Sequence, residues 1–311
     1  MLLICSNDYI IVSRKSNMYV VTMSEMSFSQ RMAAYDRTLT PAERRVIEYL
    51  ARNREMALLA SAADMAQQIG TSDATVIRTA RKLGFSGLEE MRRGLAGDLR
   101  RDLTLSERIE NDLRQTGGGV SNAVTQTVET LLATLDAMLA IPSDDLERAV
   151  DILALAQRVH IFGIGPSGHL ASYFAAQMTR LGGDARPLRQ TGIQLADDLI
   201  GVHEGDSILA LAYDRPYREI TALIDHALTL EVPVILVTSP GPILPDYRAD
   251  IVLRVARGRA DGFGLHAGTL ALLEALLTAF ASVHPNKARA TLDALNAARK
   301  AISGDGLRLK T

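Results

Sequence analysis

The sequence predicts an α/β protein, in which an all-α domain is followed by a doubly wound, five-stranded parallel sheet. Residues 39–84 form helical patterns with capping residues on both sides of a tight glycine turn. From Val159 onward, short apolar runs alternate with helical patterns, which is typical of a parallel sheet covered on both faces. Between the two regions, the three glycines Gly117–Gly119 indicate a hinge.

Length and composition narrow the class of protein. The chain has 311 residues, of which 47% are hydrophobic, enough for about two domains with real cores. Cys5 is the single cysteine, so no internal disulfide can form and a reducing cytoplasm fits the chain. No apolar run reaches the roughly 18 residues that a membrane span needs. We therefore expect a cytoplasmic protein with no membrane partner.

Five segments follow from these patterns. We expect an N-terminal extension at 1–27, a helix-turn-helix domain at 28–104, a linker with one helix at 105–141, a ligand-binding sheet domain at 142–302 and a tail at 303–311. Tyr9–Val12 is too short for the apolar part of a signal peptide, and the basic Arg14 and Lys15 follow it. Two interpretations of the extension stay open. Either the start codon is misassigned, with Met23 or Met26 as the true first residue, or the segment is a real arm or extra strand.

The first clear helix of the N-terminal domain begins after Thr40. Thr40 is a natural N-cap, Pro41 suits the first helical position, and Glu43 completes a capping box. The apolar face of this helix consists of Val46, Ile47 and Leu50.

Two shorter helices follow and predict a helix-turn-helix. Ser61 can cap the first, with Asp64 at the third helical position, and Gly70 ends it. The second runs over 73–83, between the polar pair Thr71-Ser72 and the terminating Gly84. Two short helices joined by a glycine turn form this motif. The expected packing positions are Ala66, Ile69, Val76, Ile77, Ala80 and Leu83.

The outward face of the second short helix is the candidate DNA-binding surface. In this motif, the outward residues near the helix start enter the major groove. Thr75 can contact a thymine methyl and Arg78 can reach guanine, whereas the more distal basic residues suit phosphates. Residues 71–101 carry a net charge of +3, although the whole chain has −2. The alternative is an ordinary solvated helix face. The candidates are Ser72, Asp73, Thr75, Arg78, Arg81 and Lys82.

The remaining elements alternate along the C-terminal half. A helix over 121–140 carries apolar residues on one side, and either dimerisation or packing within one subunit explains them. Another helix starts at Pro142. Expected strands are 159–162, 185–188, 207–212, 234–238 and 251–255, and expected helices are 168–181, 191–199, 217–230, 265–282 and 287–302.

Parallel sheets bind ligands outside the carboxyl ends of their strands, at the switch in strand order. The turns after Phe162, Ala212 and Thr238 are therefore the expected walls of a ligand site. Ser167 can donate its hydroxyl and backbone N–H to a phosphate at the start of a helix, or it can serve only as a cap. The candidate ligand-binding residues are Gly163, Gly165, Ser167, Gly168, His169, Tyr213, Arg215, Thr238 and Ser239.

Over residues 28–302 the chain resembles the RpiR (MurR/RpiR) family of bacterial transcriptional regulators. These proteins pair a helix-turn-helix with a sugar isomerase (SIS) domain. The resemblance implies a homodimer or homotetramer that binds a double-stranded DNA operator, responds to a phosphosugar and controls carbohydrate catabolism. The residues that carry it are 39–43 (LTPAE), 71–78 (TSDATVIR), 82–88 (KLGFSGL), 161–168 (IFGIGPSG), 181–182 (LG) and 249–251 (ADI).

The second loop of the sheet domain departs from the SIS pattern. Ser167 falls on the first phosphate-binding serine of that pattern, but Ser-x-Ser-Gly-x-Thr is replaced by AYDRPY at 212–217. Two outcomes are open for Arg215. It replaces the lost hydroxyls and binds a phosphate or carboxylate, or it pairs with Asp214, Glu219 or a neighbouring subunit. We expect a small anionic metabolite as the ligand.

Catalytic patterns are weak in this sequence. Sugar-phosphate isomerisation needs a general base. The candidate bases are His169, His203, Glu204 and His266, and no two of them are spaced as a catalytic pair. No metal-ligand spacing or nucleophile motif is present. We therefore expect a regulator without catalytic residues, metal or cofactor. The alternatives are a sugar-phosphate isomerase whose helical segment only oligomerises, and a regulator that has lost its ligand.

Overall fold

The computed structural model describes residues 2–4, 9–14, 17–22, 26, 28, 31–32, 39–213, 217–240 and 248–303. The chain divides into two compact units. The first comprises residues 1–115 with 241–245 and 260–263, and the second comprises the rest. Each unit is described by itself below.

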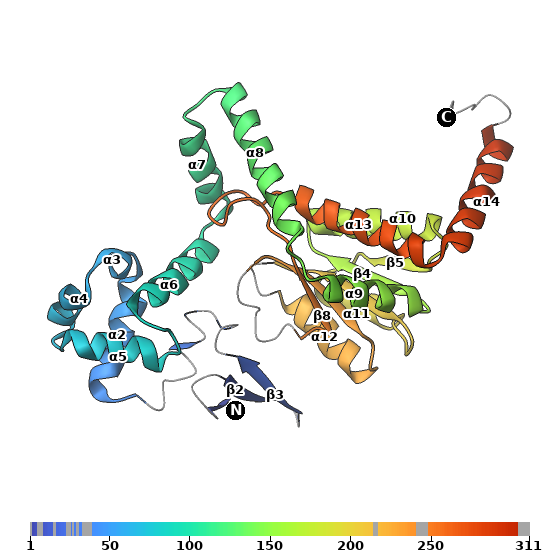
Figure 1. Ribbon diagram of the computed structural model, residues 1–311. Coiled ribbons are helices and arrows are strands. Elements are labelled where there is room, and N and C mark those ends of the chain that lie inside the picture. The colour runs from blue at the N-terminus through green and yellow to red at the C-terminus, as the bar shows by residue number, and fades with distance from the viewer. Residues whose placement is uncertain are drawn as a thin grey trace. The chain divides into compact units, whose positions relative to one another are not determined.

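The first unit is mainly helical (Figure 1). Its helices are α2 (Pro41–Arg52), α3 (Arg54–Leu59), α4 (Ala62–Ile69), α5 (Asp73–Lys82), α6 (Leu88–Asp102) and α7 (Leu105–Thr116). An antiparallel sheet of β1 (Leu2–Ile4), β2 (Tyr9–Arg14) and β3 (Asn17–Thr22) lies in the N-terminal extension.

The predicted helix starts in this unit are confirmed. The Thr40 hydroxyl oxygen accepts a hydrogen bond from the backbone N–H of Glu43, and the Glu43 carboxylate accepts one from the backbone N–H of Thr40. Ser61 and Asp64 repeat this capping box at α4. Gly70 ends α4 in the left-handed conformation, with φ 72°, which glycine adopts without steric cost.

One hydrophobic core holds these helices together. Val46 and Leu50 from α2 and Val76 and Ala80 from α5 have no exposed surface. Among the other predicted packing positions, Ala66 and Leu83 are buried, and Ile69 and Ile77 are half-buried. Thr79 is also fully buried, which its polar side chain did not suggest. Its hydroxyl donates to the carbonyl of Thr75 at 2.8 Å, so burial leaves this group satisfied.

The second unit contains the predicted five-stranded parallel sheet, which is confirmed. Its strands are β4 (Val159–Gly163), β5 (Ala185–Leu188), β6 (Ser207–Leu211), β7 (Val234–Thr238) and β8 (Ile251–Arg254). The order is β5-β4-β6-β7-β8, and all neighbours are parallel. The order reverses beside β4, so the switch point lies between β4 and β6.

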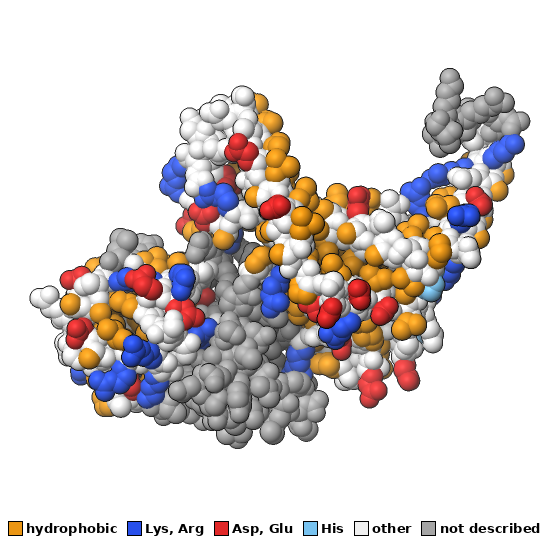
Figure 2. Space-filling view, viewed as in Figure 1, with side chains coloured by type: hydrophobic (Ala, Val, Ile, Leu, Met, Phe, Trp, Pro, Cys, Tyr) orange, Lys and Arg blue, Asp and Glu red, His pale blue; other side chains and the backbone are white. Residues whose placement is uncertain are grey.

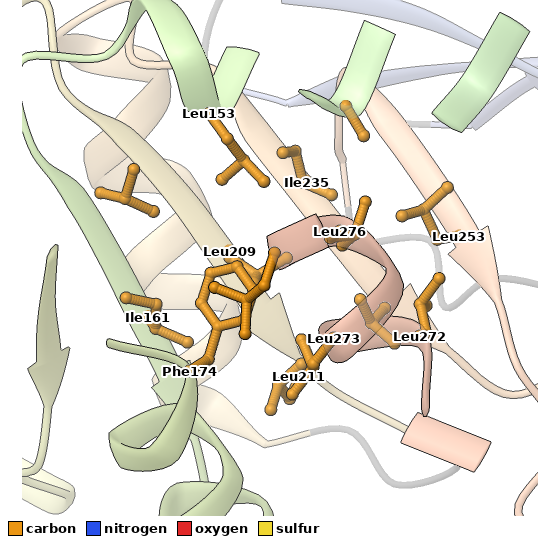
Figure 3. Close-up of a cluster of buried hydrophobic side chains, with 14 of the residues drawn as sticks. Leu153, Ile161, Phe174, Leu209, Leu211, Ile235, Leu253, Leu272, Leu273 and Leu276 are labelled. Carbon is orange, nitrogen blue, oxygen red and sulfur yellow. The ribbon is translucent and has the colours of Figure 1, made fainter. Parts of the chain in front are cut away.

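Helices cover both faces of this sheet (Figure 1). The helices of this unit are α8 (Val120–Met138), α9 (Ser143–Leu155), α10 (Pro166–Arg180), α11 (Leu195–Leu199), α12 (Arg218–Thr229), α13 (Ala267–Val283) and α14 (Pro285–Ser303), of which α8 and α14 pack on other helices rather than on the sheet. Figure 3 shows the core on the α10 and α13 side, where Phe174 and Leu273 meet the strand residues Ile161, Leu209 and Ile235. This packing fixes the carboxyl ends of the strands relative to the first turns of α10 and α13.

The helix predicted over 191–199 is shorter than expected. Residues Gly192–Gln194 form a 3-10 turn, and α11 covers only the last five residues. Gly192 has φ 61°, and a left-handed residue cannot belong to an α-helical turn. The Asp198 carboxylate accepts hydrogen bonds from the backbone N–H groups of Arg189 and Gln190, which fixes the segment before the turn.

No single helix in the described part of the chain is both long and apolar enough to span a membrane. Two consecutive pairs, α8 with α9 and α13 with α14, reach that length and composition only together, and they bend by 86° and 106°.

Candidate functional site

Helix α5 carries the residues predicted to contact DNA. Ser72 caps the helix by accepting a hydrogen bond from the backbone N–H of Thr75 at 3.2 Å. Ser72, Asp73, Arg78 and Arg81 are exposed, and Thr75 is half-buried. Neither Arg78 nor Arg81 forms an ion pair within the described residues. Their guanidinium groups are therefore available on the outer face of an ordered helix.

Lys82 has a different environment from the two arginines. Its ammonium donates to the carboxylate of Glu43 on α2 at 2.8 Å, and Glu43 is buried. Burial alone would raise the pKa of Glu43, but hydrogen bonds from Lys82 and Thr40 outweigh it and lower that pKa. The pair joins the start of α2 to the end of α5, so Lys82 supports the helix-turn-helix from within.

The turn between β4 and α10 is the candidate phosphate cradle of the second unit. A β-carbon at Gly163 would lie 2.7 Å from the backbone of Ser167, so only glycine allows this close approach. Gly165 has φ 61° and ψ −128° and precedes the helix, with Pro166 at the first helical position. The start of α10 has no side-chain cap, so its first N–H groups suit an anion.

The structure brings several predicted ligand residues to the same edge. Ser167, in the first turn of α10, is 5% exposed, whereas the nearby His169 is exposed. Thr238 ends β7 and is buried, and Ser239 follows it half-buried. Arg215 lies outside the described residues. These positions follow β4 and β7, as the sheet topology requires.

Tyr213 follows β6 but points into the core. It is 7% exposed and belongs to the cluster beneath α10 and α13. Its hydroxyl lies 2.6 Å from the Thr269 hydroxyl, in the first turn of α13. Since this hydroxyl is already paired, Tyr213 positions α13 above β6.

Arg257, which was not predicted, and His266, which was considered only as a candidate general base, lie against Tyr213. The Arg257 guanidinium carbon is 4.3 Å from the centre of the tyrosine ring, within cation–π range. Its Nη2 lies 3.0 Å from His266 Nε2. Burial and the nearby Arg257 charge lower the pKa of His266 to about 4, so its imidazole is neutral at pH 7. In the sequence, the indication that Arg257 could belong to a ligand site was its position shortly after the last strand, β8.

The opposite edge of the sheet holds a separate buried pair. His160 Nε2 and Asp206 Oδ2 are 2.9 Å apart, and the backbone N–H of His203 also donates to that carboxylate oxygen. Burial lowers the pKa of His160 more than Asp206 raises it. His160 lies at the amino end of β4 and Asp206 directly before β6, away from the ligand edge, so this pair supports the sheet.

Two family models match the chain. The helix-turn-helix domain of the rpiR family matches residues 26–102, and the SIS domain matches residues 152–282. Together they cover more than half of the sequence, and they confirm the predicted combination of domains.

Individual relatives agree with this result. The uncharacterized HTH-type transcriptional regulator YbbH of Bacillus subtilis is 25% identical over 70% of this chain and 76% of its own length. The HTH-type transcriptional regulator HexR of Pseudomonas aeruginosa is 27% identical over 65% and 70%. The Vibrio vulnificus NanR protein, solved with ManNAc-6P, has a TM-score of 0.52 at 20% identity, over 87% of this chain and 97% of NanR. Such relatives favour a regulator over the isomerase considered as the alternative.

Proposed function

Because the chain belongs to the RpiR family of helix-turn-helix regulators with a SIS domain, we propose that α5 binds operator DNA under the control of a small anionic metabolite. The observation that carries this proposal is the exposed pair Arg78 and Arg81 on a helix whose start is fixed by Ser72. On such a helix, Arg78 suits a guanine edge and Arg81 suits a phosphate. Ser72, Asp73 and Thr75 complete the proposed DNA surface at its amino end.

The proposed effector site is the turn from Gly163 to Gly168. Its close backbone approach, the uncapped start of α10 and the Ser167 hydroxyl together suit a phosphate. The structural relative NanR was solved with ManNAc-6P, which makes phosphosugars the first class of effector to test. An effector controls DNA binding only if its affinity differs between the DNA-competent and incompetent states. A cytoplasmic location, where operator and metabolite meet, belongs to the same proposal.

We also propose that the protein acts as a homodimer or a homotetramer. Helix α8 exposes an apolar face. The whole helix contains only two charged side chains, Glu129 and Asp136. Figure 2 shows hydrophobic side chains along this helix. The exposed apolar residues are Val120, Val124, Val128, Leu132, Leu135 and Leu139, the last just after the helix. A second copy that covers this face would remove a large apolar patch from water.

The test begins with capture of genomic fragments by the full-length protein at near-physiological salt. We expect enrichment of a few palindromic sites, because a dimer reads two half-sites. The double variant Arg78→Glu/Arg81→Glu should then bind these sites at least about tenfold more weakly. Arg289→Glu, an exposed charge reversal on α14, is the matched control. Diffuse, salt-sensitive binding by the wild type, or unchanged affinity in the double variant, would overturn the proposal.

A further inference from the structure

The Arg257 side chain is half-buried and has no counter-ion among the described residues. The Tyr213 ring covers one side at 4.3 Å. The backbone of Gly264 is also close, because a β-carbon there would lie 2.5 Å from Arg257 Nη2. Among the described residues, no carboxylate forms an ion pair with Arg257. In the described part of the chain, the side-chain groups beside this half-buried cation are an aromatic ring and the neutral His266.

Two buried nitrogen atoms in this cluster lack hydrogen-bond partners. They are Nε of Arg257 and Nδ1 of His266. Buried polar groups are normally satisfied, and buried charges are normally paired. Arg158, in the same unit, is paired although its side chain is 38% exposed, since its Nε and Nη2 both donate to the Asp184 carboxylate, at 3.1 and 2.9 Å. The Arg257 cluster thus differs from an ordinary structural arginine by the absence of an anion.

The cluster also lies where a ligand is expected. Arg257 follows β8 and Tyr213 follows β6, so both lie at the carboxyl edge of the parallel sheet. His266 directly precedes α13, whose start has no side-chain cap. The amino end of a helix carries a partial positive charge, which adds to that of Arg257. The Tyr213–Thr269 hydrogen bond holds α13 in this position.

We propose that Arg257 and His266 form an oxyanion subsite of the effector site at the carboxyl edge of the sheet, in addition to the turn that contains Ser167. This inference rests on the proposed function, because it assumes that the SIS domain binds a metabolite. The planar guanidinium and the adjacent imidazole offer donors that match a carboxylate or a phosphate. The oxyanion of the effector takes the place of the missing counter-ion. The protein therefore selects its effector partly through Arg257, a charged group outside the turn that contains Ser167.

A bound oxyanion would change the protonation of His266. Without an anion, burial and the Arg257 charge favour the neutral imidazole. An oxyanion that accepts hydrogen bonds from Arg257 Nε and His266 Nδ1 offsets the Arg257 charge and stabilises the imidazolium form. The pKa of His266 is thus a local reporter of occupancy.

The experiment measures that pKa by NMR of the imidazole nitrogens in the full-length protein. Titrations are run in chloride, and in inorganic phosphate or acetate at the same ionic strength. His266→Gln identifies the signal, and His284 serves as an internal reference. We expect phosphate, acetate or both to raise the pKa of His266 by at least about one unit relative to chloride. A response to acetate identifies a carboxylate as an accepted group, and a response to phosphate alone restricts the subsite to phosphate.

Two variants separate a specific site from general screening. Arg257→Met should abolish the anion-dependent shift, whereas Arg289→Met should retain it. If Arg257→Met fails to fold, the midpoint of thermal unfolding replaces it as the readout. Phosphate or acetate should then raise this midpoint in the wild type more than in His266→Gln.

Other outcomes overturn the inference. They are an unchanged pKa of His266 in both anions, a shift that persists in Arg257→Met, or an equal thermal response in His266→Gln. Operator binding is measured separately. Specific operator binding without any anion response would refute the subsite while leaving the regulator intact. An anion response without operator binding would refute the proposed function.

Discussion

At the residue scale, Lys82 shows how a residue predicted to contact DNA can also support the fold. The sequence correctly places Arg78 and Arg81 on the exposed side of α5. It does not reveal that Lys82 reaches Glu43, which is 39 residues away. Such a partner depends on how α2 crosses α5, and helical periodicity contains no information on that crossing. The same holds for Tyr213, whose hydroxyl pairs with Thr269 across 56 residues.

Lys82→Ala should therefore lower stability more than it changes sequence preference. The substitution leaves the buried Glu43 carboxylate without its charged partner, at a cost of about 1–3 kcal/mol. Arg81→Ala, on the exposed face, should change stability by no more than about 0.5 kcal/mol. Urea unfolding of the two variants measures both values. Equal stability of the two would show that the Lys82–Glu43 pair contributes nothing to the fold.

At the element scale, the strands were more predictable than the short helices. β7 matches its predicted bounds, because a strand buried on both faces is a continuous apolar run flanked by breaks. β5 also matches its bounds, although it is an edge strand with Arg186 exposed. Helix α3 was not predicted, since it is only six residues long and follows α2 after the single residue Asn53. Short helices depend on packing rather than on their own sequence.

Helix α7 was assigned to the linker for a similar reason. Its Arg108 donates to the carbonyl oxygens of Ala260 and Gly262, and its Asp112 accepts from the backbone N–H of Phe263. These partners lie about 150 residues away in the chain. Contacts of that separation are invisible to a local sequence pattern, and the Thr104–Glu107 capping box at the start of α7 was not among the predicted helix starts.

The turn between β4 and α10 gives a prediction at this scale. In Gly163→Ala, the new β-carbon would meet the Ser167 backbone at 2.7 Å, so the strand and the helix must move apart. Overpacking of this kind costs about 1–3 kcal/mol, and the movement should also weaken effector binding. Gly87→Ala is the matched control, because its β-carbon would have no atom within 4 Å and its φ of 174° suits any residue. Thermal unfolding compares the two, and a Gly163→Ala protein as stable as Gly87→Ala would contradict the close packing.

At the scale of the whole molecule, regulation depends on how many copies bind DNA together. One helix-turn-helix reads one half-site, and two linked copies read a palindrome with much higher affinity. The apolar face of α8 is the surface that we propose joins them. Periodicity predicted this helix, but it could not show which of its apolar residues face the subunit's own core. The structure leaves Leu132 and Leu135 exposed, whereas Thr134 is buried.

Leu132→Glu tests this assembly. A carboxylate in the middle of an apolar interface must lose its hydration without gaining a partner, so the dimer should weaken at least tenfold, or by about 1.4 kcal/mol. Ile193→Glu is the control, since Ile193 is 90% exposed in another part of the second unit. Sedimentation equilibrium gives the dimer constants, and operator titration gives the DNA affinity. Because the two half-sites are coupled through the dimer, operator affinity should fall in Leu132→Glu even though α5 is unchanged. A Leu132→Glu protein that keeps its dimer constant would place the interface elsewhere, and one that dissociates but binds the operator normally would show that a single copy is sufficient.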